Sequence, residues 1–219
     1  MKITLLCNCG LLIESGEDAV LVDAVNGPAM AFKALPEDEY RKMLTGEKPY
    51  EKMPGLYFTH RHLDHMDAKK VSALLTARNL AEDISPAPGV RRTGSITVTS
   101  VLFPHTPVKT VVDRPHYVLL VEAEGKLLYI TADADVDEEK HKQILNGRTV
   151  DAAFWNGQAL SYPGMRELMR TACRKNYIYH FPEDPQDGIY RKARRNLERY
   201  PEETAGVVLL NRYPTVIEL

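Results

Sequence analysis

Short runs of apolar residues, separated by turn-forming residues, predict that much of this chain folds into β-strands. Gly10 and the tetrapeptide 15–18 punctuate the first three runs, so we expect a strand meander over 3–9, 11–14 and 19–25. Later runs of similar length predict further strands at 54–59, 95–103, 117–121, 127–131, 150–155, 176–180, 206–210 and 215–219.

Between several of these runs the apolar residues recur at helical spacing. Val71 and Leu75 follow Asp67 in this way, so Asp67 is the expected N-cap of a helix. A helix is also expected soon after Asp135. In it His141 stands among charged residues, and we expect it to be solvated. Two more helices are predicted over 160–175 and 186–200.

Two segments have a weaker pattern. The stretch 28–53 has a broken helical face interrupted by Pro36 and Gly46, and its place before a histidine-rich segment predicts a flap over a functional site. The stretch 86–94 has no clear periodicity and predicts a loop that carries Arg91 and Arg92.

Length and composition narrow the choices. The 219 residues suit one domain over 1–219, and a net charge of −2 gives no overall field that would attract nucleic acid or a membrane. Cys7, Cys9 and Cys173 are too few for a disulfide framework, which favours a reducing compartment. No signal-peptide profile and no apolar run of about 18 residues is present, so we expect a soluble, cytoplasmic protein.

One short segment concentrates metal-binding side chains where a predicted strand ends and a predicted helix begins. His60 and His62 lie two positions apart, so in an extended chain both imidazoles point the same way and can share one metal ion. Asp64 and His65 follow as the chain leaves that conformation, so their side chains diverge and can reach a second ion. The segment therefore predicts a site for two metals.

The spacing His60-x-His62-x-Asp64-His65 resembles the HxHxDH motif of the metallo-β-lactamase superfamily. The resemblance implies an α/β fold, a four-layer αββα sandwich of two mixed β-sheets flanked by helices. It also implies a dinuclear metal site and, in most members, hydrolysis of an ester, lactone, amide, thioester or phosphodiester.

The resemblance further implies roles for residues that follow other predicted strands. One metal ion would take His60, His62 and His105, and the other would take Asp64, His65 and His180. Asp133 would bridge the two ions, and Asp23 would support the histidine segment from behind. Asp64 would also handle a proton during catalysis.

Three of these assignments have alternatives in the sequence. His116 competes with His105, although it opens a strand whose other residues are expected to pack. Asp135 competes with Asp133, because Ala132 replaces the Gly that usually precedes the bridging Asp in the superfamily. Asp23 could instead be an ordinary turn residue before the next loop.

The expected activity is that of a metal-dependent hydrolase in which a hydroxide between two divalent ions attacks a small-molecule substrate. Zinc is the expected metal, with iron or manganese as alternatives. A phosphodiesterase or nuclease is a second hypothesis, since Arg61, Arg91, Arg92 and the arginines between 191 and 195 could bind phosphates, although acidic residues balance the last group. A metal-binding protein without turnover is the third.

Overall fold

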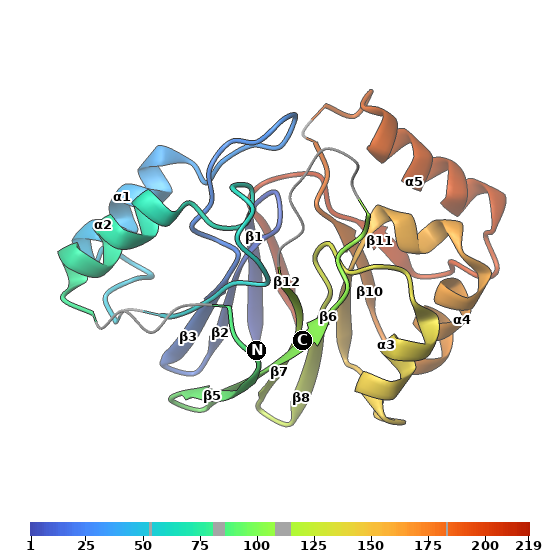
Figure 1. Ribbon diagram of the computed structural model, residues 1–219, viewed down its shortest axis with the longest axis horizontal. Coiled ribbons are helices and arrows are strands. Elements are labelled where there is room, and N and C mark those ends of the chain that lie inside the picture. Colours follow the sequence, from blue (N-terminus) through green and yellow to red (C-terminus); the bar gives the residue numbers. More distant parts are fainter. Residues whose placement is uncertain (53, 81–85, 108–114, 183) are drawn as a thin grey trace.

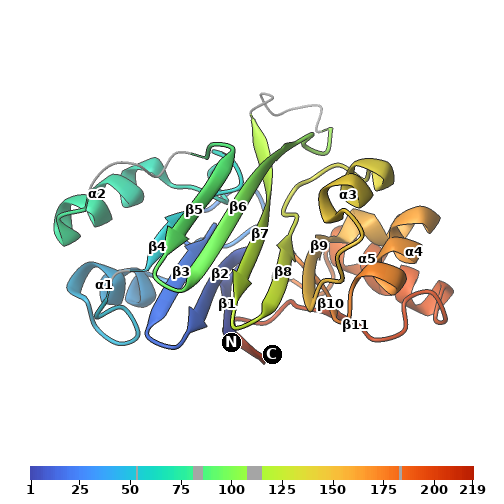
Figure 2. The ribbon, with the colours of Figure 1, turned by 90° about the horizontal axis from the view of Figure 1, so that it is seen from below.

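In the computed structural model, which describes residues 1–52, 54–80, 86–107, 115–182 and 184–219, two β-sheets face each other and helices cover both outer faces (Figure 1). Seen from below, the sheets lie side by side in the middle of the molecule, with α1 and α2 beyond one sheet and α3, α4 and α5 beyond the other (Figure 2). The predicted αββα sandwich is confirmed.

The first sheet has the strand order β12-β1-β2-β3-β4. The predicted meander forms its antiparallel centre, and β4 joins parallel to β3 because the chain returns to it through α1. The last strand pairs antiparallel with the first, which brings the two ends of the chain together. The bounds are β1 (Lys2–Cys7), β2 (Gly10–Ser15), β3 (Asp18–Val22), β4 (Gly55–Tyr57) and β12 (Thr215–Glu218).

The second sheet has the order β11-β10-β9-β8-β7-β6-β5. Its first four strands in the sequence pair antiparallel, whereas β8 to β11 pair parallel because helical segments separate them. The bounds are β5 (Gly89–Thr93), β6 (Ile96–Phe103), β7 (His116–Ala123), β8 (Lys126–Ile130), β9 (Ala152–Asn156), β10 (Asn176–Tyr179) and β11 (Val207–Leu209).

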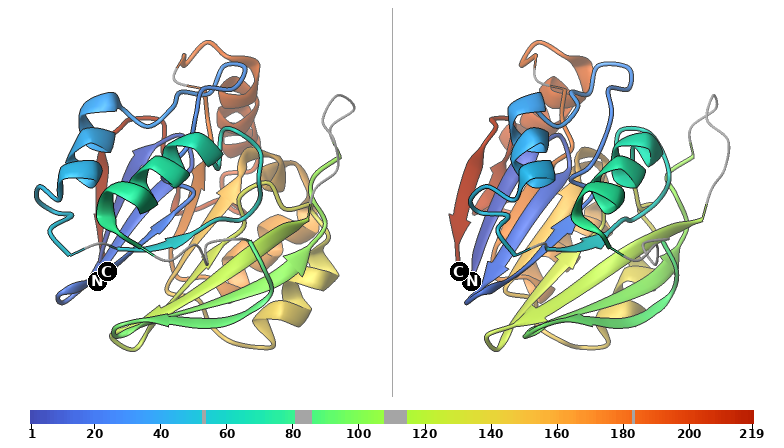
Figure 3. Two further views of the ribbon diagram at one scale, coloured as in Figure 1. Left: turned by 60° about the vertical axis from the view of Figure 1, so that its left-hand side comes forward. Right: turned by 90° about the vertical axis from the view of Figure 1, so that its left-hand side faces the viewer.

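Helices close both outer faces of the sandwich. On the first sheet lie α1 (Glu37–Thr45) and α2 (Ala68–Arg78), which Figure 3 shows from two further sides. Asp67 accepts hydrogen bonds from the backbone N–H groups of Lys69 and Lys70, as expected of an N-cap. On the second sheet lie α3 (Glu138–Leu145), the short 3-10 helix η1 (Gly157–Ser161), α4 (Pro163–Ala172) and α5 (Gly188–Arg199).

Three apolar layers hold the four structural layers together. The central one lies between the sheets, where Leu11 and Val20 of the first sheet join Val121 and Phe154 of the second. One outer layer packs α1 and α2 on the first sheet, and the other packs α3, α4 and α5 on the second. Because all three layers are closely packed, the strand ends between them are held in fixed positions.

Part of the predicted loop at 86–94 is wrong: Gly89–Thr93 forms the edge strand β5, paired antiparallel with β6. Its residues are exposed or half-buried, so no alternation of apolar residues marks it. The glycine at 94 has a φ of 57° and lets the chain turn into β6.

The prediction of a solvated His141 is also wrong. This residue belongs to α3, and its side chain is almost fully buried. Its Nδ1 lies 2.7 Å from the Tyr129 hydroxyl, and its Nε2 lies 3.0 Å from the backbone oxygen of Asp135. Burial lowers the pKa of His141 to about 4, so the ring is neutral at pH 7. The N-cap of α3 is Asp137, not Asp135.

Most of the expected flap at 28–53 lies away from the strand ends that carry the histidines. Tyr40, Met43 and Tyr50 are buried in the layer that packs against the outer face of the first sheet. Met53, its last residue, lies outside the described residues.

Among the described residues no helix is long and apolar enough to cross a membrane.

Candidate metal centre

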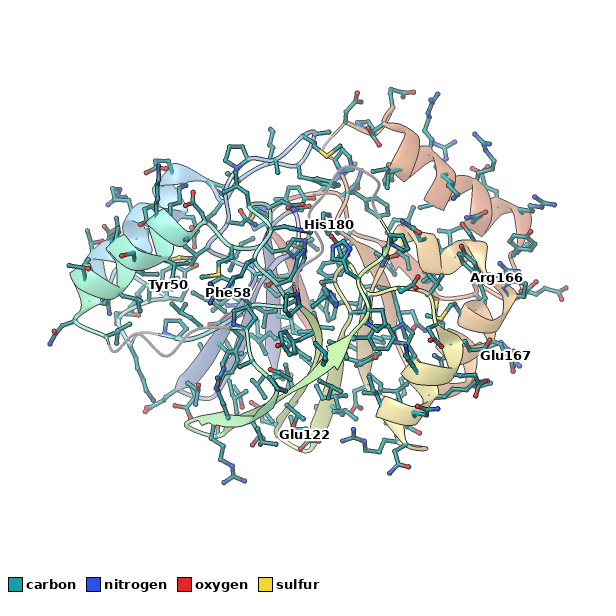
Figure 4. All side chains as sticks on the ribbon, viewed as in Figure 1. Tyr50, Phe58, Glu122, Arg166, Glu167 and His180 are labelled. Atoms are coloured by element: carbon teal, nitrogen blue, oxygen red, sulfur yellow. The ribbon has the colours of Figure 1, made fainter. Side chains whose placement is uncertain are left out.

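The predicted ligands come from loops at the carboxyl ends of four strands. His60 follows β4, His105 follows β6, Asp133 follows β8 and His180 follows β10. The strands β6, β8 and β10 run in the same direction, because two antiparallel pairings separate β6 from β8 and two parallel pairings separate β8 from β10. Their carboxyl ends therefore meet at one rim of the sandwich, where Figure 4 labels His180.

A turn in the histidine segment separates its ligands into two directions. The backbone N–H groups of His65 and Met66 both donate to the carbonyl oxygen of His62, at 3.0 and 2.8 Å. The chain is thus extended up to His62 and turned directly after it. This is the change of direction that the sequence predicts for Asp64 and His65.

The first group of side chains consists of His60, His62, His105 and Asp133. Each offers one ligand atom, and these atoms lie within 4.8 Å of one another. Nε2 of His60 lies 2.9 Å from Nδ1 of His62, and Nε2 of His105 lies 3.4 Å from Oδ2 of Asp133. Three imidazoles and a carboxylate in this arrangement fit one metal ion.

A second group lies next to it. Nε2 of His65 is 2.9 Å from Nε2 of His180, and Oδ2 of Asp64 is 3.5 Å from the same His180 nitrogen. Cys9 also touches this group, but its sulfur lies 3.3 Å from Nδ1 of His65, on the side of the ring away from His180. Burial raises the pKa of the Cys9 thiol, so it stays protonated.

Asp133 lies between the two groups. Its Oδ2 is 3.4 Å from Nε2 of His65 and 3.4 Å from Nε2 of His105, while its Oδ1 is 3.2 Å from Nε2 of His180. Burial would raise the pKa of its carboxyl group, but His180, His65 and His105 outweigh this and hold that pKa well below its ordinary value. Asp135 instead accepts a hydrogen bond from the next backbone N–H.

Three of the imidazoles have their second ring nitrogen fixed by the protein. Nδ1 of His65 lies 2.9 Å from Oδ2 of Asp23, Nδ1 of His105 lies 2.6 Å from the carbonyl oxygen of Thr106, and Nδ1 of His60 lies 3.1 Å from the hydroxyl of Thr59. A ring that donates from Nδ1 carries its lone pair on Nε2. All three Nε2 atoms face the cluster, and that of His105 is buried without a hydrogen-bond partner in the described part of the chain.

Burial and charge set different protonation preferences within the cluster. Burial, together with the neighbouring His65, lowers the pKa of His60. For His65 the cost of burial is outweighed by the negative groups around it, including Asp23 and Asp133, and its pKa is raised. The carboxylate of Asp133 among the histidines thus favours positive charge on His65 in the metal-free cluster, where a bound cation would supply that charge.

Asp23 is fully buried and fixes the histidine segment at two points. Its Oδ1 accepts a hydrogen bond from the backbone N–H of Thr59 at 2.7 Å, and its Oδ2 accepts one from the Thr59 hydroxyl at 2.7 Å as well as from His65. It is therefore not a solvated turn residue. Its φ of 50° lies in the left-handed region, which Asp tolerates better than most residues.

Sequence reasoning missed Asn8, which joins the two loops of the second group. Its side-chain amide donates to the carbonyl oxygen of Asp64 at 3.2 Å, and its backbone oxygen accepts from the N–H of His180 at 3.3 Å. Asn8 has a φ of 30° and no exposed surface. The only signal was an Asn between two strands, a residue type that adopts such φ values.

Two further residues at the centre were also not predicted. The ring of Phe32, from the loop before α1, lies edge-on to His180 with 4.3 Å between ring centroids. The backbone N–H of Ala132, at a φ of 45°, donates to the Tyr179 hydroxyl at 3.2 Å. That φ explains why Gly is usual before the bridging Asp, since only Gly adopts it without strain.

Of the basic residues of the phosphodiester hypothesis, Arg61 lies in the histidine segment itself, whereas the other two groups lie away from it. Arg91 and Arg92 lie on β5, at one edge of the second sheet. The arginines between 191 and 195 lie on α5, which packs by the opposite edge strand, β11 (Figure 1). A continuous phosphate-binding surface is therefore not formed by these two groups.

The order of the strands, the helices on both outer faces and the side chains at one rim are those of the metallo-β-lactamase fold, and the chain has this fold. Comparison with solved structures agrees. The metallo-β-lactamase fold protein YhfI from Bacillus subtilis superposes with a TM-score of 0.65 and 16% identity, over 100% of both chains. No protein-family model and no curated protein matches the sequence.

Two other solved structures share the fold and have described activities. The isothiocyanate hydrolase from Delia radicum gut bacteria matches with a TM-score of 0.66 and 14% identity, over 100% of this chain and 99% of that one. CmlA, a diiron β-hydroxylase from Streptomyces venezuelae, matches with a TM-score of 0.65 and 14% identity. The present chain spans about half of CmlA, 54% of its length. Proteins with this fold thus include an isothiocyanate hydrolase and a diiron β-hydroxylase.

Proposed function

We propose that this protein is a metal-dependent hydrolase with two divalent cations. The observation that carries the proposal is the place of Asp133, whose two carboxylate oxygens face different histidine groups at 3.2 to 3.4 Å. His60, His62 and His105 would hold one cation, Asp64, His65 and His180 would hold the other, and Asp133 would contact both. When bound, the cations would acidify a water molecule and polarise the bond that it attacks.

The chain's own residues would prepare this reaction in three ways. Asp23, Thr59 and the carbonyl of Thr106 hold the imidazoles with their Nε2 lone pairs towards the centre, so little reorganisation is needed on binding. The side chain of Asp64 is 13% exposed, compared with 4% for His180 beside it, and it can pass a proton to or from the leaving group. The ring of Phe32 shields His180 on one side.

Zinc fits the donor set best, because five of the seven donors are imidazoles, which suit zinc, and Asp carboxylates also bind it. The same donors also suit iron, and the diiron neighbour supports iron as the second choice. We infer a small-molecule substrate, since the two basic groups on β5 and α5 lie at opposite edges of the second sheet. A cytoplasmic location is supported by three cysteines that are all buried and unpaired.

A metal and substrate panel tests the proposal. Protein prepared without chelator is analysed for bound metals, and then assayed on 4-nitrophenyl acetate, γ-butyrolactone and bis(4-nitrophenyl) phosphate, with and without EDTA. We expect ester or lactone hydrolysis that EDTA abolishes and Zn²⁺ restores. Turnover of the phosphate diester alone would support a phosphodiesterase. Full metal content without turnover of a wide panel would support a metal-binding protein without enzymatic activity.

A further inference from the structure

A second feature lies beside the candidate centre, next to His105. It is a pocket of about 540 Å³ between the end of β6, the start of β7 and α3. Leu102, Phe103, Pro104 and Pro115 form apolar walls, and Lys140 of α3 lies at its margin. Leu102 is 62% exposed, so the described part of the chain leaves this apolar surface uncovered.

Besides Lys140, whose ammonium group lies 3.4 Å from Oδ2 of Asp137, two imidazoles form the polar lining of the pocket. His105 lines the pocket and also contacts Asp133, so the pocket begins one side chain away from the candidate centre. His116 lies beside it, with its ring centroid 5.6 Å from that of His105 and 5.1 Å from that of His60. The pocket and the centre therefore share a wall of histidine side chains.

His116 is the unusual member of this wall. It is 1% exposed, and neither of its ring nitrogens makes a hydrogen bond within the described part of the chain. Burial lowers the pKa of His116 to about 3, against the nearby Phe103 carbonyl, which favours the protonated form. Buried polar groups in native proteins nearly always have a partner, because an unpartnered one costs free energy. A side chain that only filled space at this position would be more stable as an apolar residue.

We propose that this pocket is the substrate-binding pocket, and that His116 at its base hydrogen-bonds a neutral polar atom of an apolar acyl or aryl group. The proposal rests on the hydrolase function proposed above, and it adds the substrate class. An imidazole offers one N–H donor and one acceptor, which match an amide, a hydroxyl or a carbonyl oxygen. The apolar walls take the hydrocarbon part, as in most small-molecule sites.

The substrate bond would then lie at the centre while its side group enters the pocket past His105. An acyl or aryl group with a polar atom beyond the scissile bond fits this arrangement. A short acyl group such as acetyl would leave the walls and His116 without contacts. His116 is thus a residue for specificity, distinct from the ligands that hold metal.

Binding of a non-hydrolysable probe tests the pocket without requiring turnover. Metal-loaded protein is titrated with 4-phenylbutanamide, which carries an apolar body and an amide, and with acetamide, which carries the amide alone. Affinities are measured by protein NMR chemical-shift changes. We expect 4-phenylbutanamide to bind at least about tenfold more tightly than acetamide, because only the larger amide fills the walls.

Two variants test the two features of the pocket, the ring nitrogens of His116 and the apolar wall at Leu102. His116→Phe keeps a ring of similar size without nitrogens, and Leu102→Trp fills the mouth from an exposed position that tolerates the change. Each should weaken 4-phenylbutanamide binding at least about tenfold, as expected for a lost buried hydrogen bond or a blocked site. His116→Gln, which restores a donor and an acceptor, should bind within about threefold of the wild type.

Val208→Trp is the matched control, since Val208 is 46% exposed on β11, at the other edge of the second sheet. It should leave binding unchanged. The proposal is overturned if the wild type does not bind 4-phenylbutanamide, or if His116→Phe and Leu102→Trp bind it as well as the wild type. Amide binding without hydrolysis of any ester or lactone would refute the proposed function alone, whereas hydrolysis without amide binding would refute the pocket alone.

Discussion

Oδ2 of Asp23 lies 2.9 Å from Nδ1 of His65, and both side chains are fully buried. A carboxylate that accepts from Nδ1 sets the ring orientation and the tautomer, so Nε2 of His65 faces Asp133 and His180 with its lone pair. This contact connects the end of β3 to the candidate centre, 42 residues further along the chain.

Asp23→Asn tests that support. An amide accepts less strongly from His65 and cannot serve Thr59 and His65 with two equivalent oxygens, so we expect Zn²⁺ affinity to fall about 10–100-fold. Competition with a chromophoric chelator measures the affinity. Asp18→Asn is the control, because it makes the same chemical change at the other end of β3. Equal affinity of the Asp23 variant and the wild type would contradict a supporting role.

The same substitution at Asp133 and at Asp135 tests which of these two residues contacts both metal sites. Asp133→Asn removes a charge that faces both histidine groups, so metal content and hydrolysis should fall by more than the about 10–100-fold expected at Asp23. Asp135→Asn should bind the full complement of metal, because that side chain pairs with a neighbouring backbone N–H. Elemental analysis of both purified variants decides between them, and the reverse result would make Asp135 the bridging residue.

The metal content of two variants tests whether His105 or His116 is the metal ligand. Nε2 of His105 lies 3.4 Å from Asp133, whereas the ring of His116 lies behind that of His105 with no atom in the ligand group. We expect His105→Ala to lose about one metal equivalent of two, since one site would lose one of its three imidazoles. His116→Gln should keep both. A loss of metal in His116→Gln with none in His105→Ala would exchange the two assignments.

Acid should destabilise the fold by protonating His141, which is not one of the proposed metal ligands. Its folded-state pKa is about 4, below the ordinary 6.5 of histidine, so between these values the unfolded chain binds the proton more readily. Stability therefore rises with pH across this window and falls by up to about 3 kcal/mol as pH drops from about 6.5 to about 4.

The measurement is urea unfolding in EDTA at several pH values, for the wild type and for His141→Gln. Glutamine can keep the contacts with Tyr129 and the Asp135 carbonyl, but it does not titrate. The variant should lose the share of His141, up to about 3 kcal/mol, while the share of His60 and His116, whose pKa values burial also lowers, remains. An unchanged slope would show that folding does not lower the pKa of His141.

Asn8 offers a test of a residue that joins two loops. Asn8→Gly keeps the φ of 30° free of strain but removes the hydrogen bond to the Asp64 carbonyl, whereas Asn8→Ala removes the bond and adds strain. We expect both to weaken Zn²⁺ binding, and the Ala variant to be less stable than the Gly variant by about 1–2 kcal/mol. Thermal unfolding and chelator competition measure the two effects, and wild-type Zn²⁺ affinity in both variants would contradict the positioning role.

The candidate centre shows where sequence reasoning succeeds and where it stops. Ligands that are local, such as His60 and His62, are visible because strand geometry alone brings them together. Distant residues such as His105 and Asp133 were assigned through the resemblance, since no local pattern states which strand ends meet. Asn8 and Phe32 escaped because their contacts are made across the fold by backbone atoms and ring edges, which leave no periodic signal.

The same division holds for the fold. Buried strands and the helix capped by Asp67 follow from apolar periodicity and capping chemistry, both of which act over a few residues. The edge strand β5 and the burial of His141 do not, because β5 carries no alternation of apolar residues and the place of His141 depends on its contact with Tyr129 of β8.

The sequence by itself determined most of the strands and helices and the pair of histidines that begin the centre, because those features depend on local spacing, whereas the class of fold came from the resemblance that the motif carries. Only the tertiary structure decided that Asp133 faces both histidine groups, that Asp23 stands behind His65, and that His116 lies buried beside an open apolar pocket. Those relations join residues from different strands, and their distances are set by how the two sheets pack.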